Sequence, residues 1–213
     1  MINNEFFNGA MVGVVHTIIG HPFDTLKTNL QNNKNIKKIK FRNLFNGITY
    51  PLISTVTICG FVFDINEFFY KKLNNHYYSG FISGLLTSPV INYIDYCKVN
   101  RQLNNKIQYS KVFKGLSASS VRESIGVSIY FGSYNQMINY NIHPFLAGGF
   151  AGVSSWVFSY PFDTIKTRLQ SGEYNNWRKS IYKGKLFSGI NIAIFRAFLV
   201  NSISFWMYEN LKS

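Results

Sequence analysis

Acidic residues and cysteines are both scarce in this chain of 213 residues. Nine Asp and Glu stand against 22 Lys and Arg, so the formal net charge is +13. The two cysteines, Cys59 and Cys97, do not have the spacing of metal ligands. The four histidines have neither the spacing of metal ligands nor that of a catalytic triad. These absences argue against a metal site and against an enzyme.

Charged residues are also missing from long stretches of the chain. The longest uncharged stretch covers 124–162, and shorter ones cover 6–23, 43–63 and 73–94. Because a helix that crosses a membrane needs roughly 20 mostly apolar residues, the longest stretch suits two helices joined by a tight loop. A last segment, 186–208, contains only one charged residue. The pattern predicts six membrane-spanning helices.

The basic residues are concentrated in three short loops. More than half of the Lys and Arg lie in segments 32–46, 103–114 and 171–188, which alternate with the uncharged stretches. Membrane proteins concentrate such cations on the inner side. We therefore expect these loops to face the inner compartment and both termini to face the opposite side. A nucleic-acid-binding protein would share the positive charge but not the uncharged stretches, so we expect no nucleic-acid partner.

A ten-residue segment occurs three times in the chain. Residues 22–31, PFDTLKTNLQ, match residues 161–170, PFDTIKTRLQ, at all but two positions. Residues 93–102, YIDYCKVNRQ, keep the Asp, Lys and Gln but have tyrosine in place of proline. Glycines before and after each copy recur at the same offsets, which is the signature of repeated structural units. We predict one domain of three repeats, which cover approximately 1–74, 75–141 and 142–213.

Each repeat is predicted to contain two helices joined by one of the basic loops. Paired glycines four residues apart let neighbouring helices approach closely in lipid. The predicted fold class is therefore all-α and membrane-embedded, with six transmembrane helices in a threefold pseudosymmetric, barrel-like bundle. The first helices of the repeats cover roughly 5–31, 77–103 and 143–171, and the second helices cover roughly 47–72, 115–138 and 189–211.

These repeats resemble the mitochondrial carrier family, whose hallmark is Pro-x-Asp/Glu-x-x-Lys/Arg on the first helix of each of three repeats. Two copies of the motif are complete here, and Tyr93 replaces the proline of the other copy. The resemblance covers essentially the whole chain, although the loops are trimmed and the family's short matrix helices stay an open question. It implies a monomeric, multi-pass transporter of small metabolites in the mitochondrial inner membrane, with alternating access and no cofactor.

The resemblance also implies a gate at the matrix end of the bundle. Each motif Asp would pair with the Lys of the next repeat, and the glutamine one turn after each Lys would brace the pair. Local pairs within one helix are the alternative, but ionisable residues at membrane depth are costly and face a partner or a cavity. The implied gate residues are Asp24, Lys27, Asp95, Lys98, Asp163 and Lys166, and the implied braces are Gln31, Gln102 and Gln170.

A second gate is implied at the outer ends of the second helices. The family pattern there is an aromatic residue, an acid and a cation three residues later, and the segment 208–212 matches it fully. The first repeat has Glu67 without a cation at the required spacing, and the second has the uncharged Asn135. The implied outer-gate residues are Glu67, Glu209 and Lys212, with simple anchoring at the membrane interface as the alternative.

The substrate contacts of the family lie on the second helices, near the middle of the membrane. Counting from the repeated glycines places Ser54, Arg122 and Arg196 there, with Glu123 beside Arg122. Because arginine binds phosphate through two parallel hydrogen bonds, we predict transport of an adenosine-bearing nucleotide or deoxynucleotide. An arginine followed by an acid resembles carriers of amino acids or S-adenosylmethionine instead, and these stay as alternatives. Pairing of Arg196 with a carboxylate elsewhere in the protein is the structural alternative.

Lipid is the other expected partner. Glycines begin the second helix of each repeat, and free amides at helix N-termini bind phosphate groups. The family binds cardiolipin at such sites, and the basic loops suit an anionic lipid. Ordinary turns at the helix starts explain the glycines equally well. A membrane adaptor of the same fold that does not transport is a further alternative, against which the intact Asp and Lys motifs argue.

Overall fold

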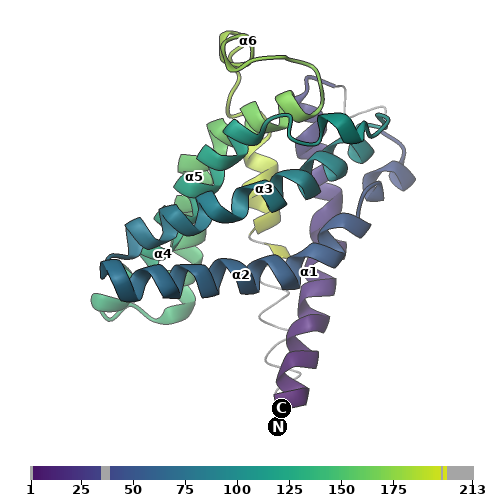
Figure 1. Ribbon diagram of the computed structural model, residues 1–213. Helices are drawn as coiled ribbons and strands as arrows, with labels where there is room; N and C mark the ends of the chain where they lie inside the picture. The colour runs from purple at the N-terminus through teal and green to yellow at the C-terminus, as the bar shows by residue number, and fades with distance from the viewer. Residues whose placement is uncertain (1, 35–38, 198, 201–213) are drawn as a thin grey trace.

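The computed structural model describes residues 2–34, 39–197 and 199–200, and these residues contain no β-strand (Figure 1). Five long helices and one short helix follow in chain order. They are α1 (Ile2–Gln31), α2 (Thr49–Leu73), α3 (His76–Gln102), α4 (Leu116–Asn139), α5 (Pro144–Gln170) and α6 (Trp177–Tyr182).

The long helices begin and end within three residues of their predicted bounds, so the predicted all-helical class is confirmed. A further helical segment begins at 190, where the sixth long helix was expected, and 201–213 lie outside the described residues. The loops after α1 and α3 contain only the short 3₁₀ helices η2 (Phe41–Phe45) and η3 (Tyr109–Lys111). The longer loop after α5 has room for α6, so one short loop helix is present among the described residues.

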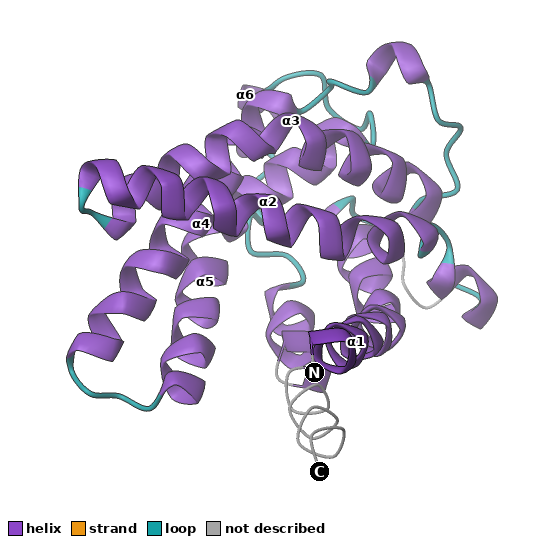
Figure 2. Cartoon of the chain, turned by 60° about the horizontal axis from the view of Figure 1, so that its bottom comes forward, coloured by secondary structure: helices purple, strands orange, loops and turns teal. Residues whose placement is uncertain are grey.

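Helix α3 lies in the middle of the described helices. It packs along α2 on one side and α4 on the other, and α4 packs along α5 (Figure 2). Gly80 and Gly84 allow α3 to approach α4, because a Cβ atom at either position would collide with the α4 backbone. No described residue lies beside Gly148 and Gly152 on α5, and the segment expected to pack against them, 198 and 201–213, lies outside the described residues. The structure therefore shows the close approach at paired glycines on α3, and on α5 it stays a prediction.

Three glycines with positive φ fix the starts of the second helices. Gly47, Gly115 and Gly189 have φ of +83°, +83° and +85°, a conformation that glycine adopts without steric cost. Each glycine also lies against the first helix of another repeat. A Cβ atom would come within 3.2 Å of the Lys98 carbonyl at Gly47 and within 3.4 Å of the Lys166 carbonyl at Gly115. The recurring Phe-x-Gly segment thus packs a loop of one repeat against the motif helix of the next.

The residue just before each motif fastens a loop to its own first helix. The Nε2 atom of His21 lies 2.9 Å from the Asn46 carbonyl oxygen. The Asn92 amide and the Tyr160 hydroxyl donate hydrogen bonds of 2.8 and 2.9 Å to carbonyl oxygens in the following loops. All three side chains are fully buried. These bonds hold the loops in place over the ends of the motif helices.

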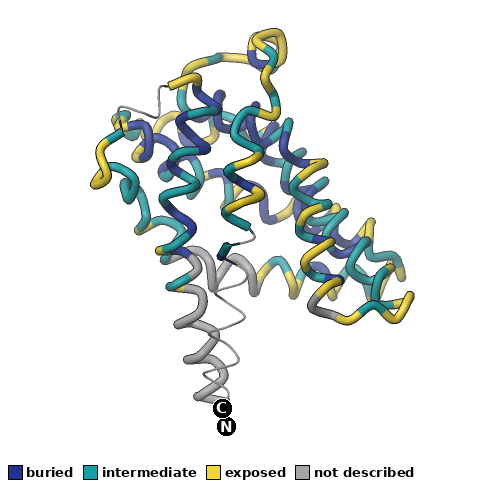
Figure 3. The backbone as a smooth tube through the Cα atoms, turned by 180° about the vertical axis from the view of Figure 1, so that it is seen from behind, coloured by how far each residue is buried: buried dark blue, intermediate teal, exposed yellow. Residues whose placement is uncertain are grey.

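The end of the bundle that carries these loops, which we call the loop end, contains many buried residues (Figure 3), and most of them are polar or charged. Every residue of 163–170 is buried, and so are most of 25–32. Hydropathy identifies no helix among the described residues that is long and apolar enough to cross a membrane. The membrane arrangement of the six helices therefore stays a prediction.

Candidate functional site

Three ion pairs join the motif helices near the loop end. Each pair connects the aspartate of one helix to the lysine of another, and α1, α3 and α5 each contribute one residue of each kind. We call these six residues the ion-pair ring. The separations between nitrogen and oxygen are 2.6 Å for Lys98–Asp24, 2.5 Å for Lys166–Asp95 and 2.7 Å for Lys27–Asp163.

The order of these pairs is cyclic around the bundle. The aspartate of each repeat contacts the lysine of the next repeat, and the third repeat closes the ring onto the first. Within the described residues, no motif aspartate lies within ion-pair distance of the lysine three residues later on its own helix. Breaking a buried pair leaves an uncompensated charge and costs roughly 3–5 kcal/mol. The ring therefore holds the three motif helices together at this level.

The three glutamines expected to brace the ring behave differently. Gln31 donates a hydrogen bond of 2.8 Å to Asp163 Oδ2, so it contacts an ion pair as expected. Gln102 instead accepts a hydrogen bond of 2.9 Å from the Thr28 hydroxyl, and Gln170 donates one of 2.9 Å to Asn92 Oδ1. In this structure the amide of Gln31 therefore contacts an ion pair, whereas the amides of Gln102 and Gln170 bind neighbouring polar groups.

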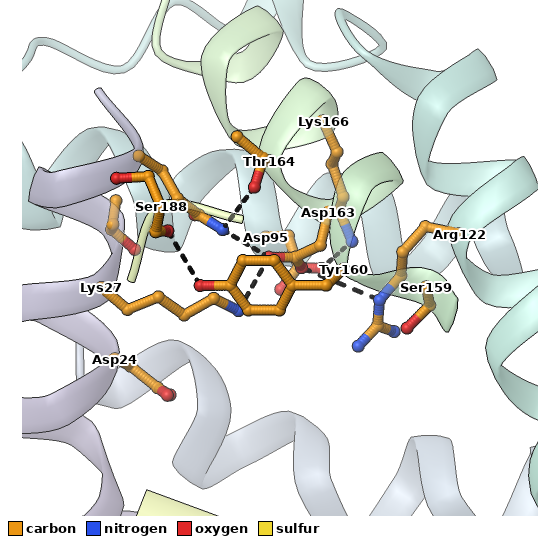
Figure 4. Close-up of polar contacts among 12 residues, drawn as sticks. Asp24, Lys27, Asp95, Arg122, Ser159, Tyr160, Asp163, Thr164, Lys166 and Ser188 are labelled. Atoms are coloured by element: carbon orange, nitrogen blue, oxygen red, sulfur yellow. Dashed lines mark hydrogen bonds and ion pairs between the residues drawn. The ribbon is translucent and has the colours of Figure 1, made fainter. Parts of the chain in front are cut away.

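The two arginines expected to contact substrate reach the aspartates of the ring. Arg196 Nε lies 2.7 Å from Asp24 Oδ1 and donates to the Gly20 carbonyl at 3.3 Å. Arg122 extends from α4 to within 3.8 Å of Asp163 Oδ1 (Figure 4). Pairing of Arg196 with a carboxylate, the structural alternative, is therefore the arrangement in this structure.

Glu123 lies in the middle of this network. Its carboxylate accepts a hydrogen bond of 2.5 Å from Arg122 Nη1, and its other oxygen lies 3.3 Å from Lys166 Nζ. The side chain is only 5% exposed. Lys166 is thus shared between Glu123 and Asp95.

Aromatic rings on α5 cover two of the cations. Lys27 Nζ lies 4.2 Å from the ring centroid of Trp156 and 5.1 Å from that of Tyr160. The Arg122 guanidinium lies 5.4 Å from the Trp156 centroid. Such cation–π contacts stabilise a desolvated cation by about 2 kcal/mol. Trp156 was not among the residues predicted from the sequence, although it lies four residues after Gly152, where the other repeats have the small polar residues Thr17 and Ser88.

A buried arginine that was also not predicted from the sequence fastens α1 to the last loop. Arg168 is fully buried and donates from Nε to the Gln31 carbonyl at 2.9 Å. Its Nη1 atom donates to the carbonyls of Ser180 and Gly184. The only sequence signal is that this position is asparagine in the other two motif copies.

The charged residues line one cavity of about 340 Å³. Its wall contains the ion-pair ring, Arg122, Glu123 and Arg196, together with apolar groups such as Ile91, Ile94 and Trp156. The five cations and four carboxylates give the cavity a net charge of +1. Among the described residues, no cluster of His, Cys, Asp and Glu is suited to a metal ion. The cavity is thus equipped to bind a small polar molecule by charge.

The remaining predicted residues do not join this site. Glu67 forms an exposed ion pair of 2.7 Å with Lys71, one turn later on the same helix. This pair therefore lies within α2 and does not link two helices. This geometry resembles interfacial anchoring more than a gate. The Ser54 side chain, Glu209 and Lys212 lie outside the described residues and side chains.

Comparisons with known proteins agree on one family. The family model for "Mitochondrial carrier protein" matches residues 2–77 and 139–213. The mitochondrial arginine transporter BAC2 of Arabidopsis thaliana is 26% identical, over 96% of this chain and 89% of that protein. The mitochondrial carnitine carrier of Saccharomyces cerevisiae is 29% identical, over 98% and 86%. The glutamate/glycine mitochondrial carrier ymc1 of Schizosaccharomyces pombe is 25% identical, over 98% and 93%. The chain therefore belongs to the mitochondrial carrier family, whose members transport small metabolites and are not enzymes.

Proposed function

We propose that this chain carries a small molecule with a carboxylate and a cationic group across the mitochondrial inner membrane by alternating access. The observation that carries this proposal is the pair of cations around Asp24. Lys98 and Arg196 lie 2.6 and 2.7 Å from that single carboxylate. Two cations on one carboxylate leave a local excess of positive charge, which attracts the carboxylate of a substrate.

The contacts of the two arginines support a substrate with a carboxylate and a cationic group better than the nucleotide predicted from the sequence. Arg122 and Arg196 are both bound to protein carboxylates. A phosphate group brings a charge of about −1.5 to −2, which exceeds the net charge of +1 on the cavity wall. A molecule with both a carboxylate and a cation instead finds a partner of opposite charge for each group, because the wall contains both cations and carboxylates. The related proteins are named for arginine, carnitine, glutamate and glycine.

A nucleotide stays as the alternative, because two arginines line the cavity and arginine binds phosphate through two parallel hydrogen bonds. The ion-pair ring supports transport over a purely structural role in the membrane, since its three pairs link the motif helices in the cavity wall near the loop end. In this proposal the loop end faces the matrix, both termini face the intermembrane space, and cardiolipin binds beside the loops.

Uptake into liposomes tests the proposal. Purified protein would be reconstituted and offered labelled L-arginine, L-carnitine, glycine, L-glutamate, S-adenosylmethionine, ATP and dATP in separate assays, with empty liposomes as the control. We expect uptake of one or more of the zwitterionic compounds and none of ATP or dATP. Uptake of a nucleotide alone would overturn the proposed substrate class and leave the family assignment intact.

A further inference from the structure

The three aspartates of the ion-pair ring are not equally neutralised. Asp24 contacts Arg196 in addition to its ring lysine, and Asp163 has Arg122 within 3.8 Å in addition to its own. Asp95 contacts only its ring lysine among the cations of the described residues. Its side chain is 30% exposed, against 18% for Asp24 and 12% for Asp163. Asp95 is therefore the carboxylate with most capacity for another cation.

The repeat explains why Asp95 differs. Arg122 and Arg196 occupy equivalent positions, seven residues after the glycine that begins each second helix. Each of these arginines contacts the aspartate of the following repeat. The equivalent position in the first repeat is Ser54, and the following repeat contains Asp95. Two ring aspartates, Asp24 and Asp163, thus have an arginine at this position of the preceding repeat. For Asp95 the same position is a serine, which has no positive charge.

The lysine bound to Asp95 also differs from the other two ring lysines. Lys166 has a second carboxylate partner, Glu123, at 3.3 Å. Lys27 and Lys98 each have one carboxylate partner among the described residues. An unpaired buried charge is strongly unfavourable, but Lys166 keeps Glu123 when Asp95 is released. The Asp95–Lys166 pair is therefore the one that a competing cation separates most easily.

Glu123, the acid that the sequence suggested for a cationic substrate, is a poorer acceptor. It already contacts both Arg122 and Lys166, and it is almost fully buried. A new cation at Glu123 would compete with both Arg122 and Lys166. At Asp95 it would compete with Lys166 alone, which keeps Glu123 as a second partner.

We infer that Asp95 binds the cationic group of the substrate, which takes the place that an arginine holds beside the other two ring aspartates. This inference rests on the proposed function. The carboxylate of the substrate binds at Arg196 and Lys98. Lys98 lies one helical turn from Asp95, and such positions are roughly 5–6 Å apart between Cβ atoms. The substrate class is therefore a carboxylic acid whose cation is several bonds away, such as an amino acid with a basic side chain.

Binding at Asp95 also opens the ring at one defined point. The substrate cation replaces Lys166 at Asp95, and Lys166 moves fully to Glu123, so both carboxylates and both cations keep partners. One of the three pairs that close the loop end is then broken. The cation of the substrate thus provides the signal that starts opening, and a molecule without the cation leaves this pair closed.

L-Arginine and L-citrulline, whose side chain is an uncharged isostere of the arginine side chain, provide the test. Their binding to the purified full-length protein would be measured by the shift in thermal unfolding temperature over a concentration series. We expect the wild type to bind arginine about tenfold or more tightly than citrulline, as for a hydrogen bond between charged groups. Asp95→Asn should reduce this ratio to about one and keep citrulline binding. Asp163→Asn, which alters the same ring, should keep a ratio well above one. Glu123→Gln should lower the ratio only in part, because Lys166 then has no carboxylate to move to while Asp95 still binds the cation.

Each other outcome has a definite meaning. A wild-type ratio in Asp95→Asn, or loss of the ratio in Glu123→Gln alone, would overturn the role of Asp95. An equal loss of the ratio in Asp95→Asn and Asp163→Asn would also overturn it. If Asp95→Asn binds neither compound, Asp95→Glu must restore the preference for arginine, and its failure to do so contradicts the inference. If the wild type binds neither compound but binds a nucleotide, the proposed function itself fails.

Discussion

Arg196 Nε lies 2.7 Å from Asp24 Oδ1, so an arginine in a position expected to contact substrate is bound to an aspartate of the ion-pair ring. The contact joins the second helix of the third repeat to the first helix of the first repeat. Any anion that binds Arg196 competes with Asp24 for the same guanidinium. Substrate binding and the stability of the ring are therefore coupled through one side chain.

Replacement of Arg196 tests this coupling. Arg196→Ala removes a charge-assisted hydrogen bond of about 1.5–3 kcal/mol, so we expect the KM for uptake of the transported carboxylate to rise by about tenfold or more. Arg196→Lys should restore only part of the loss, because lysine keeps the charge but not the planar fork. The matched control is Arg178→Ala, an exposed loop arginine. An unchanged KM in Arg196→Ala would exclude Arg196 from the binding site.

The glutamines provide a second prediction, because only Gln31 contacts an ion pair among the three. Gln31→Ala removes the hydrogen bond to Asp163 and should destabilise the closed loop end by about 1–3 kcal/mol. Gln102→Ala leaves every ring contact intact and should change closure less. Cysteine labelling at Ile94, which lines the cavity, measures closure when the reagent is added from the loop side. Equal labelling in both variants would contradict a specific brace at Gln31.

Two glycine-to-alanine substitutions distinguish the cost of a strained backbone from the general effect of replacing a glycine. Gly115→Ala forces an alanine into a left-handed conformation, which costs about 1–2 kcal/mol, and its Cβ atom would lie 3.1 Å from Gln170 Cγ. The matched control, Gly149→Ala, lies at an exposed position of α5 and should be neutral or slightly stabilising. Thermal unfolding of the two variants in the same detergent gives the comparison. Equal unfolding temperatures would show that the backbone conformation at position 115 does not require glycine.

Much of the ion-pair ring was predictable because its motif recurs at a nearly constant interval. Three Asp and Lys copies in register predict three pairs, and the geometry places them in cyclic order. The partners of Gln102, Gln170 and Arg196 were not predictable in this way. Each depends on which neighbouring side chain comes closest after the helices pack. Trp156 was missed for a related reason, since it occurs in one repeat only and threefold patterns do not reveal it.

Reagent accessibility tests the predicted orientation in the membrane. A cysteine at Tyr140, which is exposed in the connection between α4 and α5, should react with an impermeant thiol reagent added outside intact mitochondria. Cysteines at Tyr109 and Tyr182, exposed on the basic loops, should be protected until the inner membrane is permeabilised. Both native cysteines are first replaced by serine. Equal labelling at all three positions would contradict the predicted sidedness.

Charge reversal in the ring tests most directly the central claim that pairs between repeats hold the gate. Uptake into liposomes would be compared for Asp24→Lys alone, Asp24→Lys with Lys98→Asp, and Asp24→Lys with Lys27→Asp. Asp24→Lys places a third cation beside Lys98 and Arg196 and should abolish uptake. Addition of Lys98→Asp should restore a measurable part of the rate, because the pair between the two repeats forms again with reversed polarity. Rescue by Lys27→Asp and not by Lys98→Asp would contradict the account.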